Sequence, residues 1–344
     1  MLCFTEVNAY QIHIHHFSQN SSVLGLFRKN LFINLILLLL FTAALRSYFF
    51  ISGESAKVDW IFNQVIDLNS LLGSNIIQVI ASIILIGSQG ILLSNYVTEH
   101  RLSRELSVIT GAIFILFVSS ILEPKSFSVI LIANLFCVLS FGSLFKIYKR
   151  YKPIATIFNS GFYLAIATVF YIPYIIFFIP LIFGLLSLRS FNLKEFFQLL
   201  SGFICAYFLI SVLLFNLDGL SFYYEHIVRG FSWLSFDFSN LLGEVKMILL
   251  TITTVILFTF QNSLRKKKKF DAIKKIELVY WALFLGFLIL FFTHSDTNDN
   301  LILLSCPVAI LGGLIMESKD KKMVKEFVFA FLIVAYVIFV FGLV

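Results

Sequence analysis

Basic residues occupy every second gap between the apolar runs of this chain. About eleven runs of roughly 16–21 residues are present, close to the ~20 residues that a helix needs to cross ~30 Å of hydrocarbon. Only helices and closed barrels satisfy their backbone groups there, so the pattern predicts an all-α, polytopic transmembrane helix bundle. The runs are Leu31–Ile51, Ile76–Tyr96, Leu106–Leu122, Phe127–Phe145, Ile154–Ile172, Pro173–Leu188, Gln198–Leu217, Val245–Gln261, Leu278–Thr293, Leu301–Met316 and Phe327–Val344.

The charges between the runs predict the orientation of the bundle. If the spans alternate from a cytoplasmic N-terminus, the inner gaps hold 21 of the 26 Lys and Arg residues. A bias of this size in short loops is typical of the positive-inside rule. We therefore expect a multi-pass protein of the bacterial inner (cytoplasmic) membrane with a cytoplasmic N-terminus and a periplasmic C-terminus.

The stretch 154–188 admits two interpretations, one long kinked helix or two spans. A break at Tyr171–Tyr174 preserves the charge alternation, so two spans are predicted. The remaining organisation is a cytoplasmic leader, 1–30, followed by a single transmembrane domain, 31–344. The longest periplasmic loops are 52–75 and 218–244.

Composition restricts the class of protein further. At 59% hydrophobic residues with 42 Phe, the chain is predicted to be an integral membrane protein. The net charge of +7 is not interpreted as a nucleic-acid signal, because the basic run Arg265–Lys269 lies next to a span, where it would contact anionic lipid. The four cysteines lack metal-ligand spacing, so we predict neither a metal site nor a cofactor.

Both long periplasmic loops are rich in aromatic residues. The apolar residues of 52–75 have the spacing of an amphipathic helix lying in the membrane interface. One interpretation is that both loops anchor the protein at the interface, where aromatic residues are common. The other is that they fold back over the external mouth of the bundle and cover a cavity, since long loops in a tight bundle often carry function.

The centres of the spans lack ionisable residues, with Arg46 the deepest. Ion-coupled transport needs such groups at mid-depth, so it is disfavoured. The chemistry-bearing residues gather instead at the predicted outer face. There a carboxylate could deprotonate an acceptor hydroxyl while a cation neutralises a phosphate leaving group. The candidate catalytic acids are Glu54 and Asp59, and the candidate substrate- or phosphate-binding residues are Arg46, Arg229, Tyr223, Tyr224, His226, His294 and Asp296.

The middle of the chain, from Leu106 to Leu217, resembles an uncharacterised polytopic inner-membrane protein family of Bacteroidota. The resemblance rests on four segments, Leu131-Ile-Ala-Asn-Leu-Phe136, Phe145-Lys-Ile-Tyr-Lys149, Gly161-Phe-Tyr-Leu-Ala-Ile-Ala167 with Tyr171-Ile-Pro173, and Leu188-Arg-Ser-Phe-Asn-Leu-Lys-Glu195.

The layout more distantly resembles the GT-C superfamily of glycosyltransferases, which use polyprenyl-phosphate-linked sugars. The matching parts are Ser52–Asn75, for the first external loop with its catalytic acid, and Lys146–Leu188, for a basic turn followed by a glycine-containing and a proline-broken helix. The resemblance implies that Glu54, and next Asp59, supplies the acid. The usual acidic pair followed by an aromatic residue is missing here.

Three functions follow as hypotheses. The first is a GT-C-like membrane glycosyltransferase that uses a polyprenyl-phosphate-linked sugar at the periplasmic face. The second is a non-catalytic membrane subunit or scaffold of an envelope export or assembly complex, with other membrane proteins as partners. The third is a lipid transporter or channel. Whether the chain is an enzyme stays open at this stage, and membrane lipids are expected partners in every case.

Overall fold

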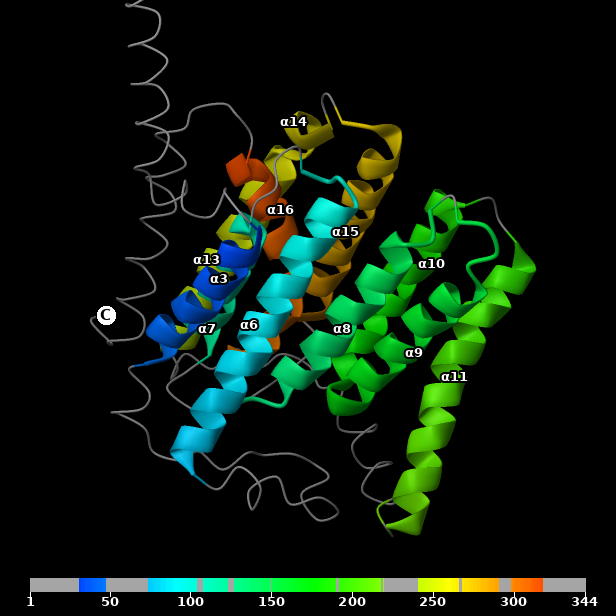
Figure 1. Ribbon diagram of the computed structural model, residues 1–344, viewed down its shortest axis with the longest axis horizontal. Helices are drawn as coiled ribbons and strands as arrows, with labels where there is room; N and C mark the ends of the chain where they lie inside the picture. Colours follow the sequence, from blue (N-terminus) through cyan, green and yellow to red (C-terminus); the bar gives the residue numbers. More distant parts are fainter. Residues whose placement is uncertain are drawn as a thin grey trace, which may run out of the picture.

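The computed structural model describes residues 31–47, 74–103, 108–122, 127–148, 150–189, 192–217, 219, 241–265, 268–290 and 298–317. Within these ranges the chain is helical and contains no strand. The helices are α3 (Leu31–Arg46), α6 (Asn75–Glu99), α7 (Ile109–Ile121), α8 (Ile130–Phe145), α9 (Ile154–Phe170), η2 (Ile172–Phe177), α10 (Phe178–Leu188), α11 (Leu193–Asn216), α13 (Leu241–Thr259), α14 (Gln261–Arg265), α15 (Phe270–Ile289), η4 (Asn298–Leu304) and α16 (Ser305–Glu317). They pack side by side into one bundle (Figure 1).

Each of the first ten predicted apolar runs contains a helix, which confirms the all-α fold. The boundaries differ, however. Helices α11 and α15 begin five and eight residues before the apolar runs, because their first turns carry polar residues. Helix α13 begins at Leu241, so the predicted loop 218–244 is too long by its last four residues. The leader 1–30 and the run Phe327–Val344 lie outside the described residues.

The predicted break near Tyr171 is confirmed. Helix α9 ends at Phe170, and Tyr171 takes an extended conformation with φ −150° and ψ 104°. Pro173 then falls in the first turn of η2, where its missing N–H costs no hydrogen bond. Because proline disfavours helical geometry in the residue before it, the sequence separates α9 from η2 and α10 at this point.

Two helices in the described residues, Ile76–Glu99 and Leu193–Asn216, are long and apolar enough to cross a membrane. The others are shorter; α7, for example, has 13 residues. Helix α11 lies at the edge of the bundle beside α9 (Figure 1), and only 22% of its apolar window is buried. Its exposed side chains include Phe197, Ile204, Phe208, Leu209, Val212 and Phe215. Helix α11 therefore presents a broad apolar surface that the rest of the described chain does not cover.

Glycine allows α9 and α11 to approach each other closely. A Cβ atom added at Gly161 would lie 2.2 Å from the carbonyl oxygen of Leu199, and one added at Gly202 would lie 2.2 Å from that of Phe158. Neighbouring α8 and α9 are joined by two hydrogen bonds, since the Ser140 hydroxyl donates to the Ser160 carbonyl at 2.7 Å and the Ser160 hydroxyl donates to the Ser140 carbonyl at 3.2 Å. Small residues at helix contacts are typical of membrane bundles.

We expect Gly161→Ala and Gly202→Ala each to destabilise the protein by about 1–3 kcal/mol, the usual range for an overpacked contact. The clash is with backbone atoms, which cannot turn aside as a side chain could. Thermal unfolding in mild detergent measures the effect. Gly312→Ala is the matched control, because its added Cβ would meet Ile113 at an ordinary 3.5 Å. Equal melting temperatures for all three variants would contradict the packing described here.

Candidate functional site

Most of the site residues predicted from the sequence lie outside the described residues. These are Glu54, Asp59, Tyr223, Tyr224, His226, Arg229, His294 and Asp296. Arg46 is described, and its side chain is completely buried in the last turn of α3. A cation in the last turn of a helix is favoured by the helix dipole. The structure therefore places one predicted phosphate contact inside the bundle end and leaves the remainder of that site as a prediction.

A buried network of uncharged polar side chains joins four parts of the chain. The Asn134 amide nitrogen donates to the Gln89 side-chain oxygen at 2.8 Å and to the Ser305 hydroxyl at 3.0 Å. The Tyr174 hydroxyl donates to the Asn134 amide oxygen at 3.1 Å, and the Gln89 amide nitrogen donates to the Leu131 carbonyl at 2.9 Å. All four side chains are fully buried. The network connects α6, α8, η2 and the start of α16.

These hydrogen bonds hold segments that are far apart in sequence. Asn134 and Ser305 are 171 residues apart, and both amide groups of the network donate and accept. A buried amide without partners is costly, whereas a satisfied network fixes the register of the helices that supply it. The sequence reasoning missed this network because it searched the apolar runs for charges and not for amides. Gln89 and Asn134 inside two such runs were the available signal.

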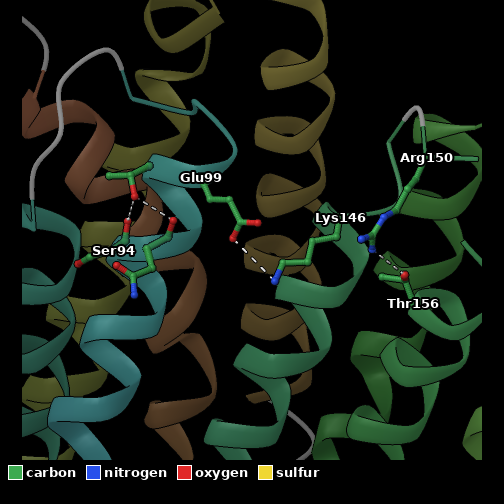
Figure 2. A network of polar contacts seen from close by, with 7 residues as sticks. Ser94, Glu99, Lys146, Arg150 and Thr156 are labelled. Atoms are coloured by element: carbon green, nitrogen blue, oxygen red, sulfur yellow. Dashed lines mark hydrogen bonds and ion pairs between the residues drawn. The ribbon is translucent and has the colours of Figure 1, made fainter. Parts of the chain in front are cut away.

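At one end of the bundle, Lys and Arg side chains link the segments that connect the helices. We call this end, uppermost in Figure 1, the basic end. Lys268 donates to the Leu102 carbonyl and Lys274 to the Ser187 carbonyl, and Arg265 pairs with Glu277. Further contacts join the ends of α8, α9, α10 and α11. Arg189 donates to the Arg150 carbonyl at 2.6 Å and pairs with Glu195 at 3.0 Å. Arg150 donates to the Thr156 hydroxyl at 3.2 Å (Figure 2). The basic gaps 99–103, 146–152, 187–195 and 265–275 thus meet.

The end of α6 presents His100 at the basic end. The Leu102 N–H donates to the Val97 carbonyl at 3.0 Å, and the Arg101 N–H donates to the Thr98 carbonyl at 3.1 Å. With Arg101 in the left-handed region at φ 51°, these two bonds form a Schellman cap. The cap turns the chain back and buries Leu102, which fixes the position of His100 at the helix terminus.

His100 lies among charged and aromatic side chains. Its ring is 5.6 Å from that of Phe145, edge to face, and 6.5 Å from that of Tyr96. The pKa of His100 is lowered to about 3, first by burial and then by the positive charges of Lys275 and Lys146, while Asp271 acts in the opposite direction. Burial also lowers the pKa of Lys275. His100 is therefore a neutral imidazole near neutral pH.

Lys146, at the end of α8, contacts side chains of α6. Its ammonium lies 3.8 Å from the Glu99 carboxylate, as Figure 2 shows, and 5.8 Å from the centre of the Tyr96 ring. Both partners of this ion pair are roughly half exposed. We call the group Glu99, His100, Lys146, Asp271 and Lys275 the basic-end cluster. In the described part of the chain, no group of three or more His, Cys, Asp or Glu side chains has the arrangement of a metal site.

Replacing Asn134 tests the buried network. We expect Asn134→Leu to lower the free energy of unfolding by about 2–4 kcal/mol. The Gln89 amide, the Tyr174 hydroxyl and the Ser305 hydroxyl would each lose a hydrogen bond while staying buried. Ser305→Ala removes one of these bonds and should cost about 1 kcal/mol. Ser120→Ala is the control, since that hydroxyl bonds only within its own helix turn. Thermal unfolding in detergent ranks the three, and an Asn134→Leu protein as stable as the control would refute the role assigned to the network.

Comparisons with known proteins give no match for this chain, whether with protein-family models, curated proteins or solved structures. What can be concluded about function therefore comes from the fold, the buried network and the two ends of the bundle.

Proposed function

We propose that the chain is a multi-pass protein of the bacterial inner membrane with its basic end in the cytoplasm. Two features support this. Large apolar side chains are exposed along the flanks of α3, α6, α11 and α13, where a water-soluble protein would carry polar ones. The described Lys and Arg residues other than Arg46 and Lys246 belong to the basic gaps, which fits the positive-inside rule. The shorter helices then cross where the bilayer thins locally or where their flanking residues extend to the interface.

Cysteine labelling tests this orientation. In a variant lacking Cys3, Cys137, Cys205 and Cys306, single cysteines replace Ser47, at the end of α3, or Tyr151, at the basic end; both positions are exposed. A membrane-impermeant maleimide should label Ser47→Cys in intact spheroplasts and Tyr151→Cys only after permeabilisation. The reverse pattern would overturn the orientation, and equal labelling of both in intact spheroplasts would overturn the membrane location.

We propose, as the function, a GT-C-like glycosyltransferase that takes a polyprenyl-phosphate-linked sugar at the periplasmic face. The supporting observation is Arg46, a fully buried cation in the last turn of α3. A guanidinium presents a planar fork of donors that suits the oxygens of a phosphate or pyrophosphate. The candidate acids Glu54 and Asp59 come 8 and 13 residues after Arg46 in the chain. In this mechanism a carboxylate deprotonates the acceptor while Arg46 and Arg229 stabilise the phosphate leaving group.

Substitution of the acids tests this function. In a deletion strain complemented with each variant, Glu54→Gln or Asp59→Asn should abolish the surface glycan that the wild type restores. A general base contributes about 10²–10⁴-fold to the rate, so the loss should exceed tenfold. Asp67→Asn, in the same predicted loop, is the control. If Glu54→Gln and Asp59→Asn both leave the glycan level unchanged at equal protein abundance, the proposed enzymatic function is wrong.

One observation favours the second candidate, a non-catalytic subunit or scaffold of an envelope complex. Phe183 of α10 stacks on Trp281 of α15 at 5.2 Å, and Phe284 packs on the same indole ring; all three are more than 40% exposed. Exposed aromatic side chains that already pack together cost little entropy to bind a partner. If this face is an interface, Trp281→Ala should abolish co-purification of partner proteins in mild detergent, while Phe208→Ala, on exposed α11, should not.

A further inference from the structure

Two basic side chains at the basic end are buried without an ionic or hydrogen-bonding partner among the described residues. His100 is 9% exposed, and its Nε2 atom is buried without a hydrogen bond. Lys275 is 4% exposed, and its ammonium makes no ion pair in that part of the chain. Its neighbour is the ring of Tyr148, 5.8 Å away. Burial of a cation costs several kcal/mol unless an anion accompanies it, on general grounds.

Both side chains lie against the end of α8, since the His100 ring is 5.6 Å from the ring of Phe145 and the Lys275 ammonium is 5.8 Å from the ring of Tyr148. Among the charges that act on the pKa of His100, Lys275 has the largest effect and Lys146 the next. The region is bounded by the capped end of α6, by Lys146 at the end of α8 and by the first turns of α15. The N-terminus of α15 adds a partial positive charge, and its N-terminal residue Lys269 supplies no side-chain cap. Three donors and a helix N-terminus therefore come from three separate elements.

The acids in this region do not remove the need for a further anion. Glu99 is 54% exposed and engages Lys146, and at 3.8 Å that ion pair is a loose one. Asp271 lies in the first turn of α15, on the same helix as Lys275, yet the two do not form an ion pair. The neutral His100 imidazole donates one N–H, and the two ammonium groups donate several more. Such a set matches the oxygens of a phosphate group, which accepts several charge-assisted hydrogen bonds at once.

We propose that the basic-end cluster is a binding site for the phosphate group of an anionic phospholipid, with His100, Lys146 and Lys275 as its donors. The site lies where helices end and where Tyr96 and Tyr148 present ring faces to ammonium groups, which is the depth of lipid headgroups in the proposed membrane orientation. It is distinct from the periplasmic chemistry, which lies at the opposite end of the bundle. The lipid phosphate neutralises buried cations and ties α6, α8 and α15 together.

The test uses the full-length purified protein in a neutral detergent. Thermal unfolding is followed with a short-chain phosphatidylglycerol, with inorganic phosphate, and with a short-chain diacylglycerol that lacks the phosphate. Phosphatidylglycerol should raise the melting temperature and diacylglycerol should not. Lys275→Met and His100→Phe should weaken the apparent affinity by about tenfold or more, because each removes a charge-assisted or buried hydrogen bond. Lys194→Met is the matched control, as an exposed lysine at the same end.

The outcomes are separable. Stabilisation by phosphatidylglycerol alone, lost in Lys275→Met and kept in Lys194→Met, supports a lipid site. Equal stabilisation by inorganic phosphate, with the same dependence on Lys275, supports the phosphate site and identifies a soluble phosphate as its source. No stabilisation by either anion, or equal loss in Lys275→Met and Lys194→Met, overturns the proposal. If Lys275→Met does not fold, Lys275→Arg should fold and bind, and a Lys275→Arg protein that folds without binding also overturns it.

Discussion

Close approach of helix backbones is the constraint on which the rest of this structure depends. In lipid, apolar side chains gain little by leaving their surroundings, so helices associate through packing and hydrogen bonds. Gly161 and Gly202 allow α9 and α11 to touch backbone to backbone, and Gly111 does the same against the Gly90 carbonyl, at 2.5 Å from an added Cβ. The glycine face of α11 makes these contacts with α9, and the exposed flank of the same helix carries large apolar residues.

The buried network and the basic end solve different problems at different depths. Around Asn134, amide and hydroxyl groups satisfy one another inside the apolar bundle, so no charge is needed to fix the relation of α6, α8 and α16. At the basic end, charged groups carry that role by donating to carbonyls left unsatisfied at helix ends, as Lys274 does to Ser187. Polar bonding thus changes from neutral to charged between the interior and the end.

Much of the fold follows from the sequence, because apolar run length and loop charge are local signals. They predict a helix in each of the first ten apolar runs and the break before Pro173, whose ring restricts the chain at that position. The network was not predictable in the same way: Asn134 meets a partner 171 positions away, and only the packed structure brings them together. Likewise, the basic gaps are visible as charge, yet nothing local shows that Lys275 is buried. For the proposed periplasmic site, Arg46 lies among the described residues and the acids stay predictions from the sequence.

The basic residues of the gaps are therefore of three kinds, and the difference matters for function. In the proposed membrane orientation, a residue that only determines topology needs to carry charge outside the hydrocarbon, and Lys194 is exposed as that role requires. Lys268, Lys274 and Arg189 do more, since they also satisfy backbone carbonyls. Lys275 fits neither description: it is buried, it donates to no described carbonyl or carboxylate, and its pKa is lowered by burial. A charge placed there without an anion would weaken the bundle, so its presence next to His100 is best explained by a phosphate that binds both.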